Sequence, residues 1–120
     1  MTSVLLVDDD PRMLVLGRKV LERQGYRVVV AANGTEAAAA VDEERFDVVL
    51  MDLEMPQVDG HEALRLIKSS QPQLPVVAVT AYAMAGDSER CREEGFDDYI
   101  SKPYRIDQLR TLVARLAGQR

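Results

Sequence analysis

The sequence feature that most constrains the fold is the run Val48–Asp52, in which four apolar residues lead directly into one aspartate. An apolar run of this length between polar segments is typical of a strand buried on both faces of a sheet. Packing alone does not place an acid at the end of such a strand. Asp52 either caps the helix that follows or lies at the carboxyl edge of a parallel sheet, where α/β proteins place their chemistry.

Apolar runs and helical periodicity predict five strands that alternate with five helices. The predicted strands are 3–7, 27–31, 46–52, 74–80 and 98–101. The predicted helices are 11–24, 35–43, 60–69, a segment within 84–94, and 106–116. The first helix has a clear start, because Asp10 is a preferred N-cap and Pro11 is favoured in a first turn. This order predicts an α/β fold with a doubly wound, five-stranded parallel sheet and helices on both faces.

Size and charge favour one small domain and exclude several function classes. The chain has 120 residues, which fits a single domain over residues 1–120. Its net charge of −5, with Lys and Arg scattered, argues against direct nucleic-acid binding. No apolar run reaches the length of a membrane span, and no signal peptide precedes the first predicted strand. We therefore expect a cytoplasmic protein that does not contact a membrane.

Polar side chains lie at the carboxyl ends of four of the five predicted strands, at the edge where the ends of parallel strands meet. They are Asp8, Asp9, Asp52, Thr80 and Lys102. Each has an ordinary structural explanation, as a helix cap, a strand residue or a solvated surface charge. Their occurrence together at one edge indicates a functional site instead.

The residue types at this edge point to phosphoryl chemistry with a divalent ion. Three carboxylates in one place repel one another unless a cation is present. An all-oxygen site without histidine or cysteine ligands suits Mg²⁺, with Mn²⁺ as an alternative. With an ion held by Asp8 and Asp9, the Asp52 carboxylate can act as a nucleophile toward a phosphoryl group. Thr80 and Lys102 supply a hydroxyl and a positive charge for the phosphoryl oxygens.

Four motifs carry a resemblance to a known family. They are Val-Asp-Asp at 7–9, Met-Asp-Leu-Glu-Met-Pro-Gln-Val-Asp-Gly at 51–60, Val-Thr-Ala at 79–81 and Tyr-Ile-Ser-Lys-Pro at 99–103. In this order and spacing they closely resemble the receiver domains of two-component response regulators, over essentially the whole chain. The segments 80–87 and 97–103 look like receivers of hybrid sensor kinases and of single-domain cell-cycle regulators. The resemblance implies a flavodoxin-like fold with strand order 2-1-3-4-5.

The resemblance also implies a role for each site residue. Asp52 would accept a phosphoryl group from a phosphohistidine on a sensor histidine kinase or a histidine phosphotransfer protein. The metal ligands would be Asp8, Asp9, Asp52 and the backbone carbonyl of Glu54. The phosphate-binding and switch residues would be Thr80, Ala81, Lys102 and Tyr99. The switch would alter the surface of the fourth helix, fifth strand and fifth helix, to which an unknown downstream protein would bind.

Several alternatives remain open at this point. Tyr99 is alternatively an ordinary strand aromatic. Glu54 and Tyr82 flank the approach of water to Asp52 and would tune the rate of dephosphorylation, unless the Tyr82 ring points to solvent. A phosphorylation-independent pseudo-receiver scaffold is disfavoured by the full set of site residues. Turnover enzymes are also disfavoured. An ATPase would need a phosphate-binding glycine loop, and none precedes the strand that ends at Asp52. A haloacid-dehalogenase-like phosphatase would have a second aspartate two residues after its nucleophile, where this chain has Glu54, and here the acid pair follows a different strand.

Overall fold

The computed structural model of the chain describes residues 2–53, 60–80, 92–101 and 105–117. The described strands are β1 (Ser3–Val7), β2 (Arg27–Ala31), β3 (Val48–Asp52), β4 (Val76–Thr80) and β5 (Asp98–Ser101). The described helices are α1 (Pro11–Arg23), α2 (Gly34–Glu43), α3 (Gly60–Ser70) and α5 (Ile106–Ala117). All strand pairs are parallel, and the sheet order is β2-β1-β3-β4-β5. The expected α/β fold and its strand order are confirmed.

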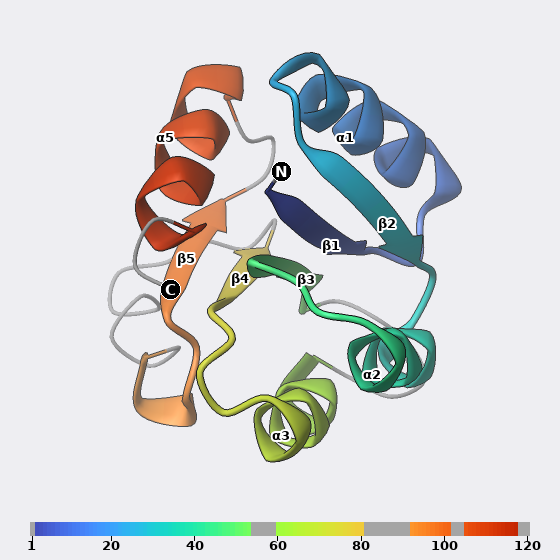
Figure 1. The fold of residues 1–120 in the computed structure, drawn as a ribbon, viewed down its shortest axis with the longest axis vertical. Helices are drawn as coiled ribbons and strands as arrows, with labels where there is room; N and C mark the ends of the chain where they lie inside the picture. Colours follow the sequence, from blue (N-terminus) through green and yellow to red (C-terminus); the bar gives the residue numbers. More distant parts are fainter. Residues whose placement is uncertain (1, 54–59, 81–91, 102–104, 118–120) are drawn as a thin grey trace.

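Helices cover both faces of the sheet, so that the central strands are buried on both sides (Figure 1). α1 and α5 lie on one face, and α2 and α3 lie on the other. Along β1, Leu5 and Val7 belong to the core cluster that includes residues of α2 and α3. Val4 and Leu6 belong to the cluster that includes residues of α1 and α5. This alternation between two buried faces explains why the strands are continuous apolar runs.

Two strands begin later than their apolar content predicts. We expect strand starts at Phe46 and Leu74, whereas β3 begins at Val48 and β4 at Val76. Both Phe46 and Leu74 are buried in the core. The backbone N–H of Leu74 is used in a turn, where it donates to the Gln71 carbonyl at 3.1 Å. Apolar residues before a strand therefore report burial, which is not the same property as strand pairing.

The first helix begins where the sequence predicts and ends at Arg23, one residue before the predicted end, with Gln24 as its C-cap. α1 begins at Pro11, and the Asp10 side chain caps it by accepting a hydrogen bond from the backbone N–H of Arg12. The helix closes before Gly25, whose φ of 87° lies in the left-handed region that glycine adopts without strain.

The second helix begins one residue earlier than predicted. The Asn33 side chain accepts a hydrogen bond from the backbone N–H of Glu36 at 2.8 Å and is the N-cap of α2. The first helical residue is consequently Gly34 rather than Thr35. Asn-Gly is also a common turn sequence, which is why the local sequence alone does not fix this boundary.

Most of the predicted fourth helix, within 84–94, lies outside the described residues, although residues 92–94 are helical. In the part of the chain that the structure describes, no helix has the length and apolar character needed to cross a membrane.

Candidate metal centre at the carboxyl edge of the sheet

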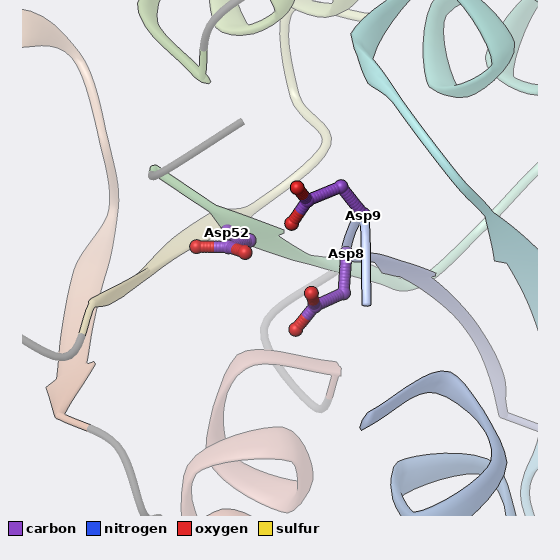
Figure 2. Close-up of side chains that lie close together, drawn as sticks. All are labelled: Asp8, Asp9 and Asp52. Atoms are coloured by element: carbon purple, nitrogen blue, oxygen red, sulfur yellow. The ribbon is translucent and has the colours of Figure 1, made fainter. Parts of the chain in front are cut away.

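Three aspartates from two neighbouring strands come together at the carboxyl edge of the sheet (Figure 2). β1 and β3 pair in parallel with Val7 opposite Met51, so the residues that follow Val7 and Met51 lie side by side. These residues are Asp8 and Asp9 after β1, and Asp52 at the end of β3. One carboxylate oxygen from each of the three aspartates lies within 4.8 Å of the other two. The strand register therefore assembles the acidic site that the sequence predicts.

The three acids differ in their access to water. Asp8 is 4% exposed and Asp52 is 2% exposed, whereas Asp9 is exposed. Burying carboxylates is costly unless their charge is compensated. An ion that enters from the Asp9 side could meet all three carboxylates while retaining water molecules on its exposed side. Such a half-open arrangement suits a centre that must also admit a substrate oxygen.

The donor set fits a hard divalent cation. All three groups offer carboxylate oxygens, and the cluster includes no imidazole or thiolate. Mg²⁺ prefers oxygen ligands and is usually bound through one or two carboxylates together with water and phosphate oxygens. Asp8, Asp9 and Asp52 are thus a suitable set to hold it.

Backbone hydrogen bonds fix the segments that carry these acids. The backbone N–H of Asp8 donates to the Ala31 carbonyl of β2 at 3.1 Å, which extends the pairing of β1 beyond its last residue. The backbone N–H of Leu53 donates to the Val79 carbonyl of β4 at 3.0 Å, which holds the chain directly after Asp52. The backbone N–H of Asp10 donates to Asp8 Oδ1 at 2.9 Å. Sequence reasoning assigned Asp10 only a capping function and missed this contact with a site carboxylate.

Two further predicted site residues lie in the neighbouring strands β4 and β5. Thr80 ends β4 and is 4% exposed; because Val79 pairs with Asp52, Thr80 reaches the same edge one residue further along. Tyr99 lies inside β5, opposite Ala78, and packs against the core cluster on the α2 and α3 side. This packing is compatible with both predicted roles of Tyr99, an ordinary aromatic residue of a strand and a switch residue.

The remaining predicted site residues lie outside the described part of the chain. They are Glu54, Ala81, Tyr82 and Lys102. Their functions stay predictions.

Comparisons with known proteins agree with the fold. The sequence profile of the response regulator receiver domain matches residues 4–114. The polar-differentiation response regulator DivK of Brucella anthropi is 41% identical over 118 residues, which cover 97% of this chain and 96% of DivK. The sensor protein GacS of Pseudomonas syringae pv. syringae is 42% identical over 120 residues, but the match spans only 13% of the length of GacS and 96% of this chain.

Solved structures give the same result. The receiver domain of the sensor histidine kinase PA1611 from Pseudomonas aeruginosa PAO1 is 34% identical, with a TM-score of 0.89 and 98% of both chains covered. That crystal structure has a magnesium ion coordinated in its active-site cleft. A CheY-like receiver domain protein from Methanospirillum hungatei JF-1 is 30% identical, with a TM-score of 0.91, covering 99% of this chain and 95% of its own. The chain therefore belongs to the response regulator receiver domain family.

Proposed function

We propose that residues 1–120 form one phosphorelay receiver domain, in which Asp52 accepts a phosphoryl group from a phosphohistidine. The observation that carries this proposal is the cluster of Asp8, Asp9 and Asp52, whose carboxylate oxygens lie within 4.8 Å of one another. A receiver with magnesium in its active-site cleft is among the similar structures, which supports Mg²⁺ as the ion. Asp8, Asp9 and Asp52 would hold the ion, together with the backbone carbonyl of Glu54.

The proposed reaction exchanges one phosphorus bond for another. A carboxylate oxygen of Asp52 attacks the phosphorus atom, the bond between phosphorus and the imidazole nitrogen breaks, and the imidazole leaves with the electron pair. Mg²⁺, when held by Asp8, Asp9 and Asp52, would supply positive charge for the phosphoryl oxygens. Thr80 would donate its hydroxyl to a phosphoryl oxygen, and Lys102 would contribute a second positive charge. Because such a transfer depends mainly on positioning and charge stabilisation, these few groups suffice.

The surface beside the acidic cluster supports a protein as the phosphoryl donor. α1 begins directly after the acidic run, and its residues Val15 and Leu16 are 55% and 53% exposed. With Pro11, Arg12 and Lys19 they line a surface hollow of about 410 Å³. Covering these exposed apolar side chains with a partner protein removes them from water, which favours binding. A sensor histidine kinase or a histidine phosphotransfer protein could dock there and present its phosphohistidine to Asp52.

After transfer, we propose that Thr80 and Tyr99 convey the new charge to the surface of the fourth helix, β5 and α5. An added phosphoryl group biases a two-state element when nearby donors bind it in only one state. Glu54 and Tyr82 would set how long the signal lasts. The partner that reads this surface is a downstream protein of unknown identity.

Phosphorylation by a small donor tests the proposal directly. With Mg²⁺ and acetyl phosphate, intact mass should rise by one phosphoryl group, and chelation of the ion by EDTA should prevent the increase. Asp52→Asn should abolish the uptake, because an amide is not a nucleophile toward phosphorus.

Asp47→Asn is a matched control for this experiment. It changes an aspartate that precedes the same strand at the opposite edge of the sheet, and uptake should remain. Equal uptake by Asp52→Asn and the parent would disprove the assignment of the phosphorylation site. A parent protein that takes up no phosphoryl group would favour the pseudo-receiver scaffold instead.

A further inference from the structure

Asp10 is joined to the acidic cluster through its own backbone. Its N–H donates to Asp8 Oδ1 at 2.9 Å, and Asp8 is buried. A hydrogen bond to a charged carboxylate is stronger and more directional than one between neutral groups. The orientation of the Asp8 carboxylate therefore depends on where the peptide group of Asp10 lies.

The first turn of α1 holds that peptide group in place. The Asp10 side-chain Oδ1 accepts from the backbone N–H of Arg12 at 3.0 Å. The Asp10 carbonyl accepts from the backbone N–H groups of Met13 at 3.0 Å and Leu14 at 3.2 Å. Asp10 has the extended conformation of an N-cap residue, with φ −91° and ψ 111°. Its side chain and its carbonyl thus bind the helix, while its N–H binds the site.

The side chain of Asp10 also pairs with the guanidinium of Arg12, in the first turn of α1. Arg12 Nε lies 3.3 Å from Asp10 Oδ1, and Arg12 Nη2 lies 3.2 Å from Asp10 Oδ2. The side-chain hydrogen bond with Asp10, and then its negative charge, raise the pKa of Arg12. This pairing compensates the charge of a fourth aspartate close to three others.

From these contacts we infer that Asp10 is a positioning residue of the metal centre, which ties the start of α1 to the Asp8 carboxylate and thereby sets the affinity for the ion. The inference rests on the proposed metal centre. It goes beyond a capping function, because a cap alone would stabilise α1 without changing the affinity of a neighbouring ion site.

Magnesium titration calorimetry on three proteins separates the two possibilities. Asp10→Ala removes the cap and one negative charge, whereas Asp10→Asn removes the same charge but keeps a good capping side chain. We expect Asp10→Ala to weaken Mg²⁺ binding about tenfold, as loss of an outer-shell contact does. Asp10→Asn should lie within about twofold of the parent, since it preserves the geometry of the Asp10 peptide group.

Asn33→Ala provides the matched control for loss of a helix cap. Asn33 caps α2 as Asp10 caps α1, so the variant should lose comparable thermal stability. Its Mg²⁺ affinity should equal that of the parent. A second readout needs no metal: the carboxyl carbon resonance of Asp8 in NMR spectra should shift in Asp10→Ala and stay in place in Asn33→Ala.

Each outcome has a distinct meaning. If the parent binds Mg²⁺ but Asp10→Ala binds it equally well, Asp10 is a helix cap only and the inference is wrong. Equal weakening in Asp10→Ala and Asp10→Asn would show that charge, rather than positioning, is responsible, and would also overturn it. If the parent itself fails to bind Mg²⁺, the proposed metal centre fails, and an unchanged Asp8 resonance in Asp10→Ala would independently reject the positioning contact.

Discussion

The two edges of this sheet use aspartate in opposite ways. At the amino edge, Asp47 precedes β3 and accepts from the backbone N–H of Ser3 at 2.7 Å. Asp97 precedes β5 and accepts from the backbone N–H of Val76 at 2.8 Å and from Lys68 Nζ at 2.7 Å. Each of these carboxylates thus joins its own strand to a neighbouring one. At the carboxyl edge, three aspartates instead gather around one another.

The direction of parallel strands explains the difference. Their amino ends project N–H groups, which donate to carboxylates, whereas their carboxyl ends project C=O groups, which only accept. An aspartate at the amino edge can therefore stabilise the sheet through the backbone itself. Aspartates at the carboxyl edge must obtain compensation from a helix start, a side chain or an ion. Carboxylates at the carboxyl edge, which strand N–H groups do not engage, are thus available to bind an ion.

The largest effect on stability should come from Asp97. Asp97→Ala removes the acceptor of a strand N–H and the partner of Lys68, whose ammonium also donates to the Leu74 carbonyl at 2.7 Å. The free energy of unfolding should fall by about 2 kcal/mol, the scale of lost hydrogen bonds to a partly exposed charged group. Urea denaturation measures this change. Mg²⁺ affinity should be unaffected, and a weakened ion site would show that the two edges are coupled.

A substitution of Asp9 should weaken Mg²⁺ binding without lowering stability, the reverse of the result expected for Asp97. Asp9→Asn removes an exposed ligand of the proposed centre, and Mg²⁺ binding should weaken about tenfold, equal to about 1.4 kcal/mol. Stability without metal should stay the same or rise slightly, because one repulsive charge is lost. Calorimetric titration and denaturation without metal check the two halves. An unchanged Mg²⁺ titration would remove Asp9 from the metal shell.

Asp47 should contribute less to stability than Asp97. Asp47→Ala removes one hydrogen bond to the first residue of β1, so the free energy of unfolding should fall by about 1 kcal/mol. Thermal denaturation measures this loss, with Asp47→Asn as a partial replacement that still accepts a hydrogen bond. If Asp47→Ala lost as much stability as Asp97→Ala, the ion pair between Lys68 and Asp97 would contribute nothing measurable to stability.

Much of this fold could be predicted, because the strands are apolar runs and α1 and α2 have side-chain N-caps. Misplaced strand starts have a physical origin: Phe46 and Leu74 are as buried as true strand residues, and no local sequence signal reports which backbone groups pair. The grouping of Asp8, Asp9 and Asp52 followed from parallel topology and was confirmed. The contact from the Asp10 N–H to Asp8 could not be predicted, since it depends on the angle at which α1 leaves the sheet.

The interior place of the N-terminal strand, between β2 and β3, has a consequence for how the molecule folds. β1 pairs with β2, where Ser3 lies opposite Arg27, and with β3, where Val4 lies opposite Val48. These long sequence separations slow folding, because loop-closure entropy is lost before the contacts form. A slip of one residue between β1 and β3 would exchange their buried faces and move Asp8 away from Asp52. An ion that binds only the assembled acids would therefore report, during refolding, the moment at which the first half of the chain reaches its native register.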